Sequence, residues 1–219
     1  MSTVPVTLAS AHLMPANPAA HLADGQADAG EQLLITAAQS GSREAFGELV
    51  ARHERAVFRT ALAALGTVEE AEDAAQDAFV VAWRKLPGFR RQASFRTWLL
   101  TIAWRKALDR RRRRTIWRSR LAPAPDAGHH AVDLLHATGS DPERQAVSAD
   151  LVRRARIEIQ RLSPRLRDAL LLACSGAHRY EEIAAMLRIP IGTVKWRVAE
   201  ARRILALRLP DAVPPRGRS

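Results

Sequence analysis

The sequence predicts an all-α protein with two small helical domains joined by a flexible linker. Apolar residues recur at the spacing of an α-helix along most of the chain, and no segment alternates apolar and polar residues over the length of a strand. The helical pattern is interrupted around residues 121–141, where Pro, Ala, Gly and His replace it. With 219 residues, of which 47% are hydrophobic, the chain can fill two small cores.

The domain boundaries follow from changes in composition. Residues 1–29 are rich in Ala, Pro, Asp and Gly without periodicity, so we expect a disordered tail there. The first domain is expected over residues 30–120, the linker over 121–141 and the second domain over 142–208. Residues 209–219 form a second tail, rich in Pro and Arg.

The first domain is expected to contain four helices. They cover residues 30–39, about 46–65, 68–86, and 95 to 114 or beyond. Gly66 stops the second helix, and Thr67 is suited to cap the third. Ser94 is a further N-cap, at the start of the fourth helix. The third helix has an apolar stripe that consists of Ala71, Ala75, Ala78, Ala82 and Leu86.

The second domain is expected to end in a helix-turn-helix. Helices are predicted from about Pro142 to Leu162, over 164–173, over 180–187 and over about 191–207. The positions with the spacing of the motif are Ile183, Ala184, Leu187, Ile189, Val194 and Val198. A plain helical hairpin would also fit. Gly192 and Thr193 favour DNA binding, because free N–H groups at a helix start can hold a phosphate.

Positive charge is concentrated in one segment. The chain has a formal charge of +11, and residues 84–120 alone carry 14 Lys and Arg against a single acid, Asp109. This focus favours a nucleic acid as partner, with an anionic membrane surface as the second candidate. The five tryptophans are Trp83, Trp98, Trp104, Trp117 and Trp196, and each lies in or beside a basic stretch. Aromatic rings among cations suit unpaired bases, although Trp83 and Trp98 also fit a helical core.

Nothing in the sequence predicts a catalytic, cofactor or metal site. Cys174 lies in an apolar helix and is expected to be a buried structural residue, and a lone cysteine excludes an intramolecular disulfide. His129, His130 and His136 lack the spacing of metal ligands. No apolar run reaches the roughly 20 residues of a membrane span, so we expect a soluble, cytoplasmic protein without membrane insertion.

Two blocks of sequence resemble a known family. The stretch AEDAAQDAF (71–79) with Trp83, followed by SFRTWLLTIA (94–103) with Asp109, is similar to conserved region 2 of bacterial sigma factors. The stretch RYEEIAAMLRIPIGTVKWRVAEARRIL (179–205) is similar to region 4. The linker has no room for a folded region 3, as in the extracytoplasmic-function group. The resemblance covers about residues 43–118 and 142–207, and the two blocks follow each other along the chain in the same order as in the family.

The resemblance implies a role in starting transcription. Its partners would be core RNA polymerase, through the β′ clamp helices and the β flap, and promoter DNA, with an anti-sigma factor as a further candidate. The residues that match the polymerase-binding helix are Asp73, Gln76, Asp77 and Trp83. Asp73, Gln76, Val80 and Trp83 lie on a face distinct from the alanine stripe, and we expect an exposed Trp83 there.

The DNA contacts are also implied by the resemblance. In the loop and helix start that capture the melted −10 element, the matching residues are Arg91, Gln92, Ser94, Phe95 and Trp98. Contacts to the −10 duplex and its phosphates are expected from Arg105, Lys106, Arg110 and Arg113. The recognition helix for the −35 element presents Gly192, Thr193, Lys195, Trp196, Arg197, Ala199, Glu200 and Arg203.

The sequence also departs from the family. Trp104-Arg105 stands where Arg-Asn is frequent, Arg188 stands at the turn glycine, and Glu200 stands where a basic residue is frequent. The alternative function is a helix-turn-helix transcriptional regulator that does not bind core polymerase. Such a regulator would need neither the second face of the third helix nor the basic, aromatic segment after it.

Overall fold

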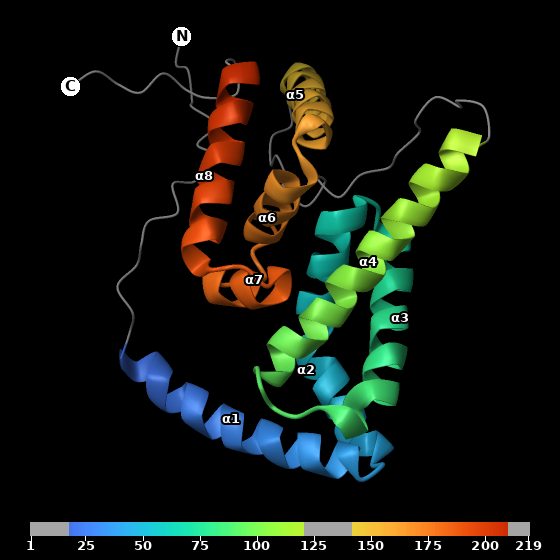
Figure 1. Cartoon of the computed structure of the whole chain (residues 1–219), viewed down its shortest axis with the longest axis vertical. Coiled ribbons are helices and arrows are strands. Elements are labelled where there is room, and N and C mark those ends of the chain that lie inside the picture. Colours follow the sequence, from blue (N-terminus) through green and yellow to red (C-terminus); the bar gives the residue numbers. More distant parts are fainter. Residues whose placement is uncertain (1–17, 121–141, 210–219) are drawn as a thin grey trace.

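The computed structural model describes residues 18–120 and 142–209 of the chain (Figure 1). Within these residues every regular element is a helix. In chain order they are α1 (Pro18–Gln39), α2 (Arg43–Leu65), α3 (Val68–Lys85), the short 3₁₀ helix η1 (Leu86–Gly88), α4 (Phe95–Arg120), α5 (Pro142–Arg161), α6 (Pro164–Cys174), α7 (Tyr180–Leu187) and α8 (Ile191–Arg208). The first four α-helices form the first domain and the last four the second, so the predicted all-α class is confirmed.

The first domain is built around an alanine-rich face of α3. The buried residues of this helix are Ala71, Ala74, Ala75, Ala78 and Ala82. Small side chains allow neighbouring helix axes to approach closely, and α2 and α4 both pack against α3. The predicted stripe is therefore the core of the domain. Larger side chains, such as Leu49 and Val57 of α2 and Leu99 of α4, fill the remaining space.

Most helix boundaries of the first domain fall where the sequence predicted. Gly66 adopts a left-handed conformation, with φ of 84°, and its N–H donates to the Leu62 carbonyl at the end of α2. The Ser94 hydroxyl accepts a hydrogen bond from the N–H of Thr97 and caps α4. Thr67 precedes α3 as expected, but its hydroxyl donates to Glu70 instead of accepting from the backbone.

The first helix is longer than predicted. It begins at Pro18, so residues 18–29, which we expected in the disordered tail, are helical. The reason is composition: alanine has the highest helix propensity, and proline is tolerated in the first turn. The alanines in this stretch are Ala19, Ala20, Ala23, Ala27 and Ala29. In Figure 1, α1 runs across the end of the α2–α4 bundle.

The second domain contains the predicted helix-turn-helix. Helices α7 and α8 begin where expected, and Ile183, Val194 and Val198 are buried between them and α6. Arg188 ends α7 in the left-handed region, with φ of 56°, at the position where the family has glycine. Cys174 differs from the prediction. It is exposed although it lies one turn after the buried Leu170, because Cys174 is the last residue of α6 and the buried residues of the helix end at Leu172.

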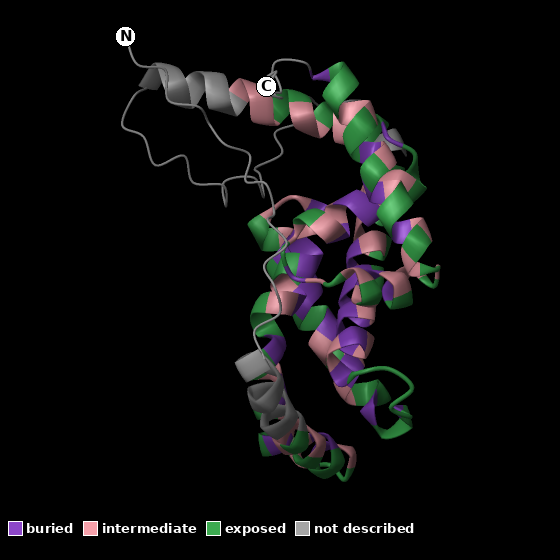
Figure 2. Cartoon of the chain, turned by 90° about the vertical axis from the view of Figure 1, so that its left-hand side faces the viewer, coloured by how far each residue is buried: buried purple, intermediate pink, exposed green. Residues whose placement is uncertain are grey.

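The two domains pack against each other. Helix α7 contacts α4, α6 contacts α2, and buried residues of both domains form one continuous hydrophobic cluster. Figure 2 shows the buried positions gathered on the faces that the helices turn toward one another.

Replacing Arg188 with glycine is expected to stabilise the second domain by about 1 kcal/mol, because an L-residue with a side chain is strained at a left-handed position. The measurement is thermal unfolding followed by circular dichroism. Ala185→Gly is the matched control on the exposed side of α7, and should cost about 1 kcal/mol, as glycine does inside a helix. A destabilising Arg188→Gly would show that the side chain of Arg188 stabilises the turn more than the strain costs.

Candidate functional site

The second face of α3 is exposed as the sequence predicted, except at one residue. Asp73, Gln76 and Asp77 are exposed, and Val80 retains 50% of its accessible surface. Trp83 was expected to be an exposed apolar residue, but it is half-buried. Its ring packs against that of Phe46 on α2, with centroids 5.0 Å apart. The apolar centre of this face is therefore Val80, with Trp83 at its edge.

Acidic residues of α3 hold arginines of α4. An oxygen of Asp73 lies 2.5 Å from an Nη atom of Arg110, and Glu70 pairs with Arg114. Arg114 also donates to the Leu65 carbonyl, at the last turn of α2. The pair between Asp73 and Arg110 joins a residue expected at the polymerase with one expected at DNA.

The run of five arginines, 110–114, divides among different partners. Arg110 and Arg114 turn to α3, and Arg111 lies 2.9 Å from Asp168 on α6. Arg112 and Arg113 are exposed and make no ion pair with the acids of the described residues. A helix turns 100° per residue, so the five guanidinium groups cannot share one face. Only part of the predicted basic surface is therefore open to a phosphate.

The loop before α4 rests on a cluster of aromatic rings. The centroid of Phe89 lies 4.9 Å from that of Trp98 and 5.9 Å from that of Phe95, and the ring of His53 of α2 lies 5.5 Å from that of Phe95, tilted by 50°. Phe95 was expected to meet an unpaired base, but its side chain is only 2% exposed. Its ring packs into the cluster and is not available to a base in this conformation. Trp98 is half-buried.

The remaining loop residues reach the surface. Arg91, Gln92 and Ser94 are exposed, as predicted for groups that meet DNA. Arg91 has a left-handed backbone, with φ of 57°, and its guanidinium donates to the Thr36 hydroxyl of α1. The Gln39 amide donates to two carbonyls at the start of this loop, those of Leu86 at 3.1 Å and Phe89 at 3.0 Å.

Sequence reasoning missed this contribution of α1. Glu31 of the same helix lies 3.4 Å from Nε2 of the buried His53, and this neighbour lowers the pKa of the Glu31 carboxyl. Gln39 of α1 thus holds the start of the loop, and Glu31 of the same helix supports the aromatic cluster through its contact with His53. The sequence predicted a helix over residues 30–39, which contains these side chains, but nothing in it indicated the contacts.

The duplex-contacting residues predicted on α4 lie on one side of the helix. Lys106, Arg110 and Arg113 are spaced by four and three residues, which places them in line along its surface, and Arg105 is exposed beside them. Trp104 differs from these neighbours. Only 2% of its surface is exposed, and its side chain points away from them, toward the second domain.

Helix α8, the predicted recognition helix, leaves all of the predicted residues at least partly exposed. Gly192, Lys195, Trp196, Ala199 and Arg203 are exposed, and Thr193, Arg197 and Glu200 are half-buried. Trp196 retains 61% of its surface. The opposite face of α8 is buried in the core. The outward residues therefore have a fixed orientation, which a helix needs in order to contact bases in the major groove of DNA.

Glu200 forms an ion pair with a neighbouring residue on the exposed side of α8. Its two carboxylate oxygens accept hydrogen bonds from Nε and Nη2 of Arg203, both at 2.8 Å. The bidentate pair lowers the pKa of Glu200 and raises the pKa of Arg203. The carboxylate therefore orients Arg203 on the exposed side of α8.

The described residues offer neither a metal site nor a membrane-spanning helix. Residues 18–120 and 142–209 contain no cluster of His, Cys, Asp and Glu that could hold a metal ion. The histidines at 129, 130 and 136 lie outside the described residues. None of the described helices is long and apolar enough to cross a bilayer.

Comparison with known proteins agrees with both halves of the fold. Residues 49–116 match sigma-70 region 2, and residues 158–205 match sigma-70 region 4. The chain is 30% identical over 184 residues to the RNA polymerase sigma-H factor of Pseudomonas aeruginosa, covering 80% of this chain and 91% of that protein. It is 30% identical over 178 residues to the ECF RNA polymerase sigma factor SigW of Bacillus subtilis, covering 81% and 95%.

Two solved structures share the fold. The structure of CnrH in complex with the cytosolic domain of CnrY matches with a TM-score of 0.57 at 27% identity, over 84% of this chain and 99% of that one. The sigma factor RpoE of Bartonella quintana, in complex with the anti-sigma factor NepR, matches with a TM-score of 0.54 at 25% identity, over 75% and 96%. The chain belongs to the extracytoplasmic-function group of the sigma-70 family, whose members bind core RNA polymerase and direct it to promoters.

Proposed function

We propose that three separate surfaces of this sigma factor divide the work of initiation. The exposed face of α3 binds core polymerase, the loop before α4 captures the melted −10 element, and α8 reads the −35 element. The observation that carries this division is that α3 is buried on its alanine face alone, which leaves a second, exposed face for a partner. A helix-turn-helix regulator would have no use for that face, so the alternative is not favoured.

The polymerase surface is centred on Val80. An apolar side chain surrounded by Gln76 and Asp77 has the make-up of a small protein interface, in which an apolar centre is rimmed by polar groups. We assign Trp83 to the edge of this surface, where its ring packed on Phe46 supports it. The β′ clamp helices are the proposed partner of α3. The β flap is the proposed partner of the second domain.

The −10 surface combines a polar loop with cations. We assign capture of unpaired bases to Arg91, Gln92 and Ser94, with the half-buried Trp98 as the stacking ring. Phe95 supports this loop from the core.

Cations of α4 take the duplex phosphates in this proposal. Arg105, Lys106 and Arg113 are assigned to them directly. Arg110 joins them when it leaves Asp73, or contacts phosphate while Asp73 orients it.

The remaining partners follow from the family. One similar structure contains a sigma factor in complex with an anti-sigma factor, and we propose that an anti-sigma factor also binds this chain. Sigma factors are polymerase subunits and not enzymes, and we propose no catalytic role here. The chain would act in the cytoplasm, where polymerase meets the nucleoid.

Replacing Gln76 and Val80 together with alanine is expected to weaken binding to core polymerase by about tenfold, because interface centres contribute most of the affinity. The measurement is titration of the labelled chain with core polymerase, followed by run-off transcription from a promoter. Val68→Ala is the control, since Val68 is an exposed valine of the same helix, near its start. Unchanged affinity of the double variant would remove α3 as the docking helix.

Replacing Glu200 with alanine is expected to change which −35 sequence is preferred, by about 1–3 kcal/mol of discrimination. The substitution removes a possible base contact and releases Arg203 from its fixed orientation. The measurement is binding to a library of −35 variants at several salt concentrations. Glu158→Ala is the control, because this glutamate also binds an arginine of α8, Arg208. Uniformly stronger binding to all sequences would mean that Glu200 only repels phosphate.

A further inference from the structure

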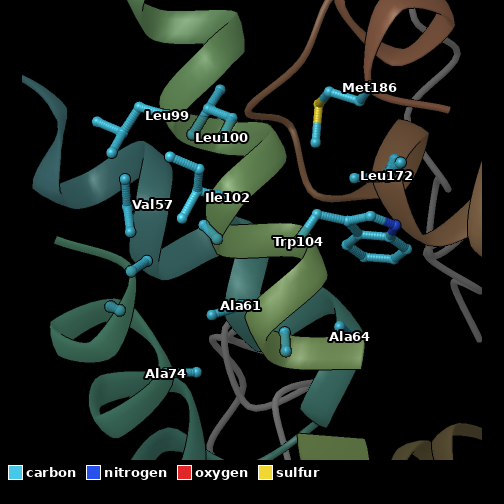
Figure 3. Packing of buried hydrophobic residues seen from close by; sticks show 14 of the residues in the cluster. Val57, Ala61, Ala64, Ala74, Leu99, Leu100, Ile102, Trp104, Leu172 and Met186 are labelled. Atoms are coloured by element: carbon cyan, nitrogen blue, oxygen red, sulfur yellow. The ribbon is translucent and has the colours of Figure 1, made fainter. Parts of the chain in front are cut away.

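The four tryptophans of the first domain differ in how far they are buried. Trp83 and Trp98 are half-buried beside other aromatic rings. Trp104 is buried and points toward Leu172 on α6 (Figure 3). The fourth, Trp117, lies near the end of α4 and retains 65% of its accessible surface. The packing of the described residues accounts for the first three tryptophans and not for Trp117.

Trp117 lies on a part of α4 that extends past the helical bundle. One turn earlier, Arg114 pairs with Glu70 in the first turn of α3 and donates to the carbonyl of Leu65, the last residue of α2. The residues after Arg114 therefore lie beyond the ends of both neighbouring helices. Figure 1 shows the last turns of α4 running past α2 and α3. Trp117 is thus presented on a projecting helix end.

Trp117 continues a line of cations along α4. Lys106, Arg110 and Arg113 follow one another at intervals of four and three residues, so they lie on one side of the helix. Trp117 comes four residues after Arg113, on the same side. At a rise of 1.5 Å per residue, Trp117 lies about 6 Å beyond Arg113 and about 16 Å from Lys106 along the helix axis. The side of α4 assigned to duplex phosphates therefore ends in an exposed indole.

The sequence around Trp117 carries positive charge only. Residues 110–120 contain seven arginines and no acid. Of these, Arg112 and Arg113 are exposed and make no ion pair with acids of the described residues. The apolar centre of a protein interface is depleted of charge, whereas a ring among cations suits a nucleic acid, whose phosphates the cations neutralise. DNA is therefore a better match to this surface than a protein.

The position of Trp117 along α4 decides which part of a promoter it meets. In the proposed function, the loop before α4 captures unpaired bases of the −10 element, and the cations further along α4 take phosphates of the duplex. Residues still further along the helix therefore lie beside DNA that is farther from the melted strands. The DNA on that side is the double-stranded segment that leads to the −35 element.

We infer that Trp117 is a further DNA-binding residue, whose indole lies against the sugar-phosphate backbone of the double helix immediately upstream of the −10 element. The inference rests on the proposed assignment of the −10 surface to the loop and to α4. At 3.4 Å per base pair, the 16 Å between Lys106 and Trp117 span about five base pairs, which sets the distance over which the contact is expected.

The contact at Trp117 does not select a base sequence. An indole has one N–H donor and no acceptor, so it cannot match the pattern of donors and acceptors that distinguishes one base pair from another. Its ring covers sugar atoms, and its N–H is suited to a phosphate oxygen. Trp117 thereby holds the duplex next to the point where the strands separate, whatever the sequence there.

Trp117→Ala tests this inference on two fork-junction DNAs. Both contain a single-stranded −10 element and lack a −35 element. One has an upstream duplex of about 12 base pairs and the other of about two, too short to reach Trp117. Titration of core polymerase carrying the full chain should show about fivefold weaker binding of the variant to the long fork, because a buried tryptophan often dominates a contact, and no change on the short fork. A different upstream sequence should leave the loss as large.

Ile116→Ala is the matched control. Ile116 is 46% exposed, and it lies 100° around the helix from Trp117, on the line of Arg112 and of Asp109, the single acid of residues 84–120. Its substitution also removes exposed apolar surface from the end of α4, but away from the cationic line. The control should bind both forks as the unsubstituted chain does.

A photoreactive residue identifies the partner directly. With p-benzoylphenylalanine in place of Trp117, irradiation of the polymerase complex on a full promoter should cross-link the chain to the duplex within about five base pairs upstream of the −10 element. Cross-links to polymerase or to the single-stranded −10 element instead would overturn the inference.

The outcomes separate this inference from the proposed function. An equal effect of Trp117→Ala on the long and the short fork, or an equal loss in Ile116→Ala, overturns the duplex contact and leaves the proposed function intact. An unsubstituted chain that binds neither core polymerase nor either fork would instead contradict the proposed function.

Discussion

The packing of α4 against α2 and the alanine face of α3 is the interaction on which the rest of the structure depends. It fixes the rotation of α4 about its axis, and that rotation decides which side chains meet which partner. Leu99 and Ala103 turn to the core, Arg113 to solvent, and Trp104 to the second domain. A larger residue at Ala75 or Ala78 would push the helices apart and move all of these surfaces together.

Electrostatic compensation is the second organising feature. The basic segment is not a uniform cationic surface, because acids from α3 and α6 take three of the arginines of the 110–114 run. These partners reduce the repulsion among neighbouring guanidinium groups. They also mean that binding of DNA competes with ion pairs already formed, so that the charge available to phosphate depends on the state of the protein.

Periodicity and capping predicted much of this fold, because they are local. Ser94 and Gly66 lie at helix ends as expected, and the outward residues of α8 follow from the anchoring of Val194 and Val198. The burial of Phe95 and Trp104 could not be predicted in this way. Both depend on residues far away in the sequence, His53 for the first and Leu172 for the second, and a helical pattern contains no information about such contacts.

The two hydrogen bonds from Gln39 have a practical consequence for anyone who divides this chain into fragments. The match to sigma-70 region 2 begins at residue 49, and a fragment trimmed to it would lack Gln39, Thr36 and Glu31. The carbonyls of Leu86 and Phe89 would then lose their side-chain donor, and the loop that begins there would no longer be held against α1. A fragment meant to retain the architecture of the −10 surface has to start upstream of Glu31.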